Sequence, residues 1–115
     1  MTLTDARSRL DTIANSFSPD RTVTRETRKG FGSGALKVKG KIFAMVSSDS
    51  EFVVKLPKSR VEELVRAGVG SRFEPGPGRV MKEWLAMARE PQSPSWLELA
   101  REAQRFVGGA RKRNR

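Results

Sequence analysis

The side chains that could perform acid–base, nucleophilic or metal chemistry are few in this chain. The sequence has no cysteine, histidine or tyrosine, which excludes a thiolate nucleophile, an imidazole base and any Cys or His metal ligand. The closest carboxylate groupings are Glu62 with Glu63 and Asp49 with Glu51. The first falls on a polar helix face and the second in a predicted turn, as is usual for solvated surface charge. We therefore predict that the protein is not an enzyme, needs no cofactor and binds no metal.

Basic residues are the main chemical feature of the sequence. Lys and Arg number 23 against 13 Asp and Glu, which gives a net charge of +10 and an isoelectric point near 11.1. Such a charge favours polyanionic partners over neutral ones. Residues 110–115 contain no hydrophobic side chain large enough to anchor them, so we expect a disordered basic tail. Its basic residues are Arg111, Lys112, Arg113 and Arg115.

A second basic group lies in the middle of the chain. Lys37, Lys39 and Lys41 are spaced by two residues. In a regular strand the first two project to one face of a sheet, and Lys41 then lies near them across a turn. Such a row could follow the phosphates of a nucleic acid. Lysines on the solvent side of a sheet also prevent edge pairing, and this alternative stays open.

Two further motifs have structural explanations that we favour over functional ones. The glycine-rich stretch Gly30–Ala35 could cradle a phosphate, but a phosphate loop requires a helix after it. Here an alternating strand pattern follows, which indicates a tight bend that leads into a hairpin. Trp84 and Trp96 could stack on nucleic-acid bases. Each lies in an apolar run, so we expect both in the core.

Apolar residues at helical spacing predict three helices. The first covers about residues 4–16, with Thr2 or Thr4 as its cap. A short second helix begins at Ser59 and is closed by Gly68. The third is capped by Ser93, has Pro94 at its first position and stops at Gly108–Gly109. Its apolar stripe consists of Trp96, Leu99, Ala100, Ala103, Phe106 and Val107.

Alternating or continuous apolar runs predict the strands. A hairpin over residues 36–46 turns at Gly40, and a strand at 51–56 extends it to a three-stranded antiparallel meander. A strand is also expected at 80–87. Two segments are weaker: residues 21–29 form an edge strand or an extended connection, and residues 68–78 form a loop with at most a short strand around Phe73.

This order of elements predicts an α+β fold. We expect a two-layer sandwich in which helices pack on an antiparallel sheet of about four to five strands, with terminal helices at both ends. The length suits a single domain, which we place at residues 1–109, followed by the tail at 110–115. No apolar run approaches the ~18 residues of a membrane span, and the N-terminus does not resemble a signal peptide. We therefore expect a cytoplasmic protein with no membrane partner.

Several of these segments also match the pattern of a known family. They are Phe31-Gly32, the run from Lys39 to Val46, the strand Phe52–Leu56 and the segment Val80–Leu85. In order and spacing they resemble the N-terminal domain of TfoX/Sxy proteins, to which YjbR-like domains are related, over about residues 6–107. The resemblance implies a small bacterial-type α+β domain and an association with the regulation of natural competence genes. The family has no established active site, so no residue roles are transferred.

We therefore predict a non-enzymatic regulatory module that binds nucleic acid non-specifically through phosphate contacts. The residues expected to make these contacts are Lys37, Lys39, Lys41, Arg111, Lys112, Arg113 and Arg115. The alternative is a protein-interaction adaptor or a homodimerising domain with no nucleic-acid role. A continuous positive patch on the sheet would favour the first function, and an exposed apolar sheet face or edge would favour the second.

Overall fold

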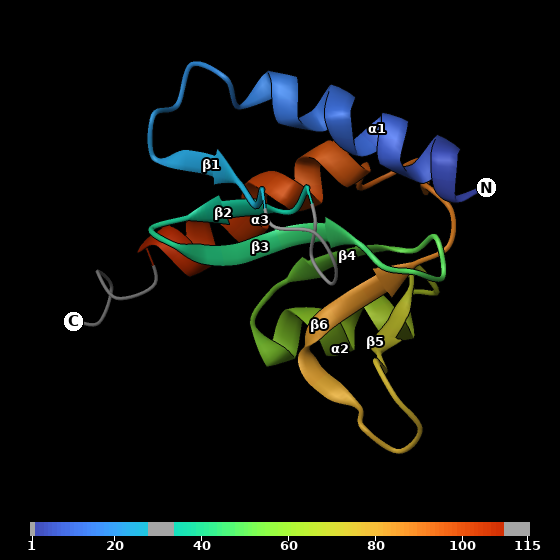
Figure 1. Ribbon diagram of the computed structural model, residues 1–115. Helices are drawn as coiled ribbons and strands as arrows, with labels where there is room; N and C mark the ends of the chain where they lie inside the picture. The colour runs from blue at the N-terminus through green and yellow to red at the C-terminus, as the bar shows by residue number, and fades with distance from the viewer. Residues whose placement is uncertain (1, 28–33, 110–115) are drawn as a thin grey trace.

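The protein is a two-layer α+β sandwich in the computed structural model, which describes residues 2–27 and 34–109. In this part of the chain, six strands form one sheet in the order β1-β2-β3-β4-β6-β5, with every neighbouring pair antiparallel (Figure 1). The strands are β1 (Val23–Arg25), β2 (Leu36–Val38), β3 (Lys41–Val46), β4 (Phe52–Lys55), β5 (Ser71–Phe73) and β6 (Met81–Met87). The helices are α1 (Leu3–Ser16), α2 (Lys58–Arg66) and α3 (Trp96–Gly109). The predicted fold class is confirmed, and the sheet is wider than expected because both weak segments pair as edge strands.

One face of the sheet holds the main hydrophobic core. All three helices place their buried residues against this face, which makes it the helix-covered face. Trp96 is fully buried there and stacks on Phe52, with ring centroids 4.7 Å apart and an interplanar angle of 18°. Phe17 meets Phe43 edge-on at 5.6 Å and so joins the end of α1 to β3. The expectation that Trp96 is a core residue is confirmed.

The opposite face, which we call the helix-free face, has its own smaller cluster. Its buried members are Ala35, Met45, Val53, Phe73 and Ala86, and Ile42, Met81 and Trp84 pack against them half-buried. Apolar residues on both faces explain why β3 and β4 read as nearly continuous apolar runs rather than as alternating ones. The second tryptophan therefore also packs on a hydrophobic cluster, but on the other side of the sheet.

The hairpin of β2 and β3 turns through Lys39 and Gly40. Both residues have positive φ, 55° and 80°, which is the conformation of a two-residue turn that matches the twist of the flanking strands. The register pairs Val38 with Lys41 directly across this turn, and a bulge separates Leu36 from Lys37. Glycine suits the second position because it adopts positive φ without a steric cost. The predicted hairpin and meander are confirmed.

The predicted start of α3 is wrong by two residues, whereas its predicted end at Gly108–Gly109 agrees with the structure. The cap is Ser95 rather than Ser93: the hydroxyl of Ser95 accepts from the Glu98 N–H at 3.1 Å, and the Glu98 carboxylate accepts from the Ser95 N–H at 2.8 Å. This reciprocal capping box satisfies two backbone donors, which a cap at Ser93 would not do here. At the other end the helix continues through Gly109. Glycine at position 108 lets α3 lie close to β2, since a Cβ there would be 3.0 Å from Val38 Cγ2.

The remaining boundaries are close to the predicted ones. Thr2 caps α1, its hydroxyl accepting from the Asp5 N–H at 3.1 Å. The second helix begins one residue before Ser59, after Pro57. The bend predicted at 30–35 lies mostly outside the described residues, and the tail predicted at 110–115 lies entirely outside them. No helix in the described segments is both long enough and apolar enough to cross a membrane.

Candidate functional site

The three lysines of the hairpin do not form the single row that the sequence suggests. Lys37 pairs across the sheet with Ile42 and so faces the helix-free side. Lys41 lies opposite Val38 and shares its side, the helix-covered one, because directly opposed residues project to the same face. Lys39 sits in the turn itself and is exposed. The prediction of one face for Lys37 and Lys39 is wrong because the turn interrupts the strand's alternation at Lys39.

Lys37 is already engaged by an acidic residue. Its Nζ lies 3.2 Å from Oε1 of Glu26, whose side chain is only 7% exposed. A buried carboxylate needs such a charge partner, since burial of an unpaired charge is costly. Lys37 therefore has a structural role, whereas Lys39 and Lys41 are both exposed at the hairpin turn.

A groove lies beside this turn, between the hairpin, the start of α2 and the end of α3. Its volume is about 880 Å³, and it is shallow and widely open to solvent. Pro57 gives it an apolar wall, Val38 lies almost fully buried at its base, and Gly108 and Gly109 border it at the end of α3. The remaining lining residues are Thr22, Lys39, Arg60, Glu102, Gln104, Arg105 and Phe106.

One cation of the groove is held in place by acidic neighbours. Arg60 donates to both oxygens of Glu102 at 3.0 and 2.9 Å, and its Nη1 lies 3.1 Å from Glu63. The hydrogen bonds that Arg60 donates to Glu102 raise the pKa of Arg60 above its ordinary value, although partial burial opposes this. The pair links α2 to α3 across the groove. The two parallel hydrogen bonds fix the Arg60 guanidinium, and its charge largely neutralises Glu102, the single carboxylate that lines the groove.

The other two cations of the groove, Lys39 and Arg105, have no ion-pair partner among residues 2–27 and 34–109. Both side chains are exposed. Together with Lys41, which projects to the same side of the sheet, they form what we call the cationic rim of the groove: Lys39, Lys41 and Arg105. Sequence reasoning identified the two lysines but missed Arg105, which lies on α3, 64 residues after Lys41.

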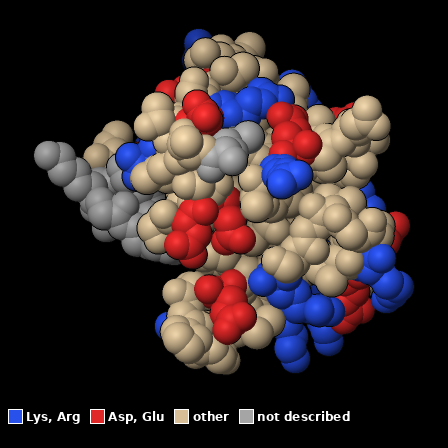
Figure 2. All heavy atoms as spheres, turned by 90° about the vertical axis from the view of Figure 1, so that its right-hand side faces the viewer, with Lys and Arg blue, Asp and Glu red and all other residues tan. Residues whose placement is uncertain are grey.

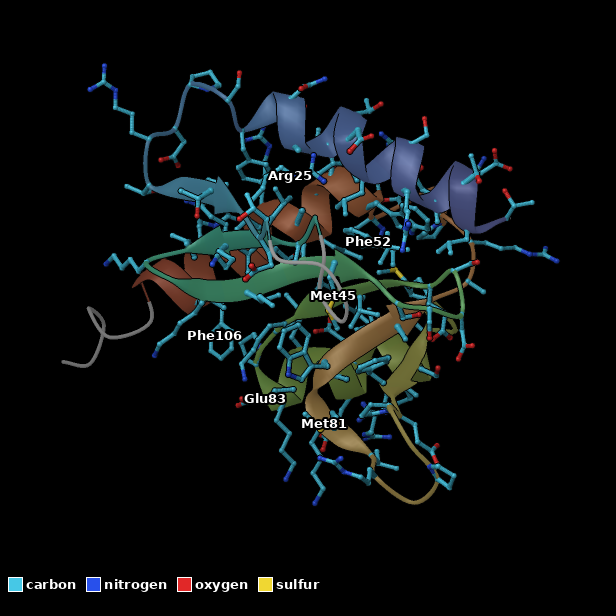
Figure 3. The ribbon with its side chains drawn as sticks, viewed as in Figure 1. Arg25, Met45, Phe52, Met81, Glu83 and Phe106 are labelled. Atoms are coloured by element: carbon cyan, nitrogen blue, oxygen red, sulfur yellow. The ribbon has the colours of Figure 1, made fainter. Side chains whose placement is uncertain are left out.

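Phe106 is the aromatic residue of the groove. The other Phe and Trp side chains in the described segments belong to one of the two hydrophobic clusters, whereas Phe106 belongs to neither and is partly exposed (Figure 3). It was expected in the apolar stripe of the last helix. That stripe is centred near Ala103 and Val107, and Phe106 is about 100° away from Val107 around the helix. Its ring therefore lines the groove and does not enter the core.

Of the carboxylate groupings noted in the sequence, Glu63 of the first pairs with the groove residue Arg60, whereas the second lies elsewhere. Asp49 and Glu51 are in the β3–β4 turn, at the opposite end of β3 from the cationic rim, and both of their N–H groups donate to the Ser47 hydroxyl. Figure 2 faces that end of the sheet and shows acidic side chains near its centre, with a separate group of basic side chains at the lower right. Partial burial, with a smaller contribution from Asp49, raises the pKa of Glu51. The described residues contain no group of three or more His, Cys, Asp or Glu that could hold a metal ion.

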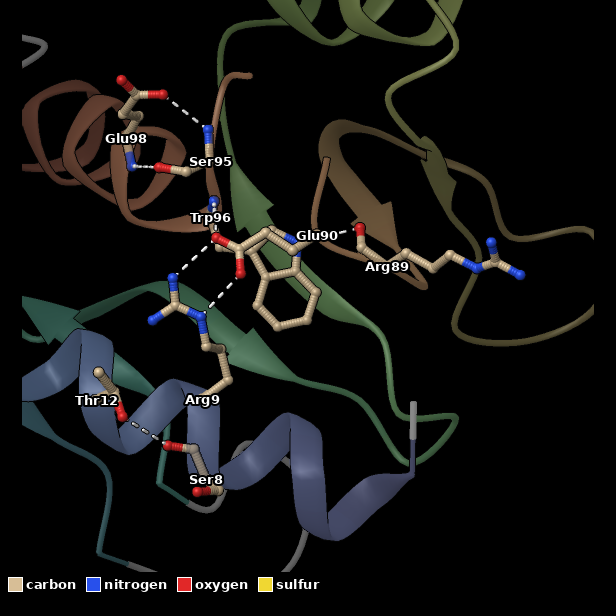
Figure 4. Close-up of polar contacts among 8 residues, drawn as sticks. All are labelled: Ser8, Arg9, Thr12, Arg89, Glu90, Ser95, Trp96 and Glu98. Atoms are coloured by element: carbon tan, nitrogen blue, oxygen red, sulfur yellow. Dashed lines mark hydrogen bonds and ion pairs between the residues drawn. The ribbon is translucent and has the colours of Figure 1, made fainter. Parts of the chain in front are cut away.

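A separate polar contact joins α1 to the start of α3. Arg9 donates to both oxygens of Glu90 at 2.8 and 2.9 Å, and the Trp96 N–H donates to the same carboxylate at 3.1 Å (Figure 4). The hydrogen bond from Arg9 lowers the pKa of Glu90, against a smaller effect of burial. This contact positions the N-terminus of α3, and hence the helix whose far end forms the groove.

Replacing Glu90 with glutamine is expected to change the pH dependence of stability. The folded pKa of Glu90 is below its unfolded value of about 4.3, so its ionised form stabilises the fold above that pH, and the contribution is lost as the pH falls through the folded pKa. Glu90→Gln should therefore lower the free energy of unfolding by about 1 kcal/mol at neutral pH and flatten its fall in acid. Urea unfolding between pH 2.5 and 7 measures this.

Glu51→Gln is the matched control, with the opposite sign. Its raised folded pKa means that the ionised carboxylate disfavours the fold above the unfolded pKa. The variant should be more stable than the parent at neutral pH and no different well below pH 4. Acid curves of the same shape for both variants would contradict the assignment of these two shifts.

Comparison of the chain with protein-family models, with curated proteins and with solved structures finds no match. The resemblance to the TfoX/Sxy N-terminal domain stays a prediction.

Proposed function

We propose that the protein is a small non-enzymatic regulatory module that binds nucleic acid, largely without sequence specificity, through contacts to phosphates. The main support is the cationic rim, where exposed cations from two distant parts of the chain meet at one end of the molecule. The tail at 110–115 follows Gly109, which borders the same groove. Four more basic residues of the sequence are therefore joined to the chain beside the rim.

Ion pairs neutralise only part of the positive charge of the protein. Six of the 23 basic residues lie at 28–29 and 110–115, so the described segments have 17 against 13 acidic residues. Within those segments, six of the 17 cations take part in ion pairs with acidic side chains: Arg9, Arg25, Lys37, Lys55, Arg60 and Arg72. The excess positive charge is thus associated with the unpaired surface cations and the basic tail.

Binding of this kind has a defined salt dependence. Each phosphate neutralised releases counterions, so the logarithm of the binding constant falls by roughly 0.7 to 0.9 per contact for each tenfold rise in salt. We expect a slope near −4 for the full chain, which corresponds to about four or five phosphates of a duplex or about six of a single strand. We also expect a chain ending at Gly109 to show a slope shallower by roughly 2, because about half of these contacts come from the tail.

Fluorescence anisotropy of labelled DNA and RNA, single-stranded and duplex, tests this proposal with both chains across a salt series. A shallower slope for the truncated chain, with unchanged thermal stability, supports phosphate contacts by the tail. If neither chain binds at low salt, the proposal is wrong. An unchanged slope after truncation would exclude the tail and leave the rim alone as the contact surface.

One observation favours the alternative class, a protein-interaction adaptor or a homodimerising domain. The helix-free face is apolar rather than positive, since Lys37 and Lys55 on it pair with Glu26 and Glu83.

Two other observations count against this alternative. The centre of the helix-free face is buried within the monomer, with Val53 at 0% and Met45 at 3% exposure. The edge strands β1 and β5 are only three residues long, which limits pairing between copies. We therefore place nucleic-acid binding first and expect a monomer in sedimentation velocity, whereas a stable dimer would favour the alternative.

A further inference from the structure

We infer that the groove beside the cationic rim binds one nucleotide of a single strand, with its base against the Phe106 ring and its phosphate on Lys39 and Arg105. This inference rests on the proposed function and deepens it, because it assigns a preference for unpaired strands. Phosphate contacts alone would give no such preference.

The position of Phe106 is the first argument. A phenylalanine at the end of a helix normally packs on the core, yet this ring lies outside both hydrophobic clusters and lines the groove. An aromatic face beside cationic side chains is the usual platform for an unstacked base. Arg105 precedes Phe106 directly in α3, so one helical turn supplies both a phosphate contact and a stacking surface.

The size and walls of the groove are the second argument. Its volume of about 880 Å³ lies within the range of roughly 300 to 1,000 Å³ that is typical of small-ligand sites. Pro57, which is half-buried, provides apolar surface for the flat base beside the ring, whereas Val38 is only 2% exposed and lies behind Gly108. The close approach of α3 to β2 at Gly108 keeps these walls together, since any larger residue would meet Val38.

The charge of the lining selects an anionic ligand. The charged residues that line the groove are three cations, Lys39, Arg60 and Arg105, and one carboxylate, Glu102. The Glu102 carboxylate already accepts two hydrogen bonds from Arg60. A ligand with an apolar body and a negative group, such as a nucleotide, complements this arrangement. A neutral or basic peptide would leave Lys39 and Arg105 without a counter-charge.

Two polar side chains of the groove already have an intramolecular partner. The Thr22 hydroxyl donates to Asp20 at 2.6 Å, and the Gln104 side-chain amide donates to the other oxygen of Asp20 at 3.1 Å. The hydrogen bonds from the Thr22 hydroxyl and the Thr22 N–H lower the pKa of Asp20. Because Thr22 and Gln104 use these donors within the protein, few hydrogen-bond donors of the groove remain to distinguish one base from another by its edge. We therefore expect stacking with little base preference.

The test compares Phe106→Leu with the parent chain on a single-stranded oligonucleotide and on the duplex of the same sequence. Leucine preserves apolar volume but removes the ring. Since stacking of one base contributes about 1 to 3 kcal/mol, single-strand affinity should fall roughly 5- to 150-fold. Duplex affinity and the slope of affinity with salt should stay the same. Phe106→Trp keeps an aromatic ring and should bind the single strand about as tightly as the parent chain. Trp84→Leu, on the helix-free face, should not weaken single-strand binding.

A direct contact is checked by photocrosslinking of strands that contain 5-iodouracil, with the crosslinked residue located by mass spectrometry. A crosslink at Phe106 supports the inference. If the parent chain binds with the expected salt slope and Phe106→Leu binds equally well, the inference is wrong while the proposed function stands. If the parent binds no nucleic acid at low salt, both fail. A mononucleotide that binds as tightly as the strand would overturn the assignment to a strand.

Discussion

The triple variant Lys39→Gln, Lys41→Gln, Arg105→Gln is expected to bind single-stranded DNA about 100-fold more weakly than the parent chain at 0.1 M monovalent salt. Each lost contact to a phosphate of a single strand removes about 0.7 from the slope, and hence about fivefold in affinity at this salt concentration. The slope itself should become shallower by about 2. Anisotropy titrations at four or more salt concentrations measure both quantities.

The matched control removes the same amount of charge from another part of the surface. Arg66, Arg79 and Lys82 are exposed, do not line the groove and have no ion-pair partner in the described segments. Their replacement with glutamine also lowers the net charge by three, but it should weaken binding by less than about fivefold through the long-range field alone. Equal losses for the two triple variants would show that only net charge matters and would contradict a local site.

Replacing Trp96 with alanine is expected to have the largest effect on stability. The side chain is fully buried and stacks on Phe52 at 4.7 Å, and its indole N–H donates to the Arg89 carbonyl at 3.3 Å. Loss of a buried tryptophan leaves a cavity and costs about 3 to 5 kcal/mol. A domain of this size is stable by roughly 5 to 15 kcal/mol, so the variant should be close to the limit of folding. Urea unfolding followed by circular dichroism measures the change.

Trp84→Ala is the appropriate comparison for this variant. Trp84 is half-buried on the helix-free face, where Lys55 Nζ lies 5.3 Å from the centre of its ring. Because less of its surface is removed from water, its replacement should cost clearly less than that of Trp96. A larger loss for Trp84→Ala than for Trp96→Ala would contradict the placement of the main core on the helix-covered face.

Most of the fold could be predicted from local patterns. The 3-4 spacing of Leu3, Ala6, Leu10 and Ile13 places a single apolar stripe on α1, and the short connections of the meander require antiparallel pairing. The exact cap of α3 was missed because Ser93-Pro94 and Ser95 are both plausible helix starts. What decides between them is the reciprocal bonding of Ser95 with Glu98, which depends on the geometry of the folded turn.

The candidate site was only partly predictable. A spacing of two between lysines implies one face only if the strand is uninterrupted, and the turn at Lys39 and Gly40 separates Lys37 from the other two. The groove itself joins residues from the hairpin, α2 and α3, and no local pattern indicates that these three segments meet. The adjacent pair Arg105-Phe106 at the end of a helix was the available signal, but helical spacing alone assigned Phe106 to the core.

The most direct test of nucleic-acid binding is the affinity of the full chain for a labelled single strand and for the matching duplex, measured by anisotropy across a salt series. We predict binding to both, a slope near −4 on the single strand, and tighter binding of the single strand than of the duplex. Absence of binding to either nucleic acid at low salt would contradict the account. The net charge of +10 would then have a role in solubility, and the helix-free face would become the surface to examine for protein partners.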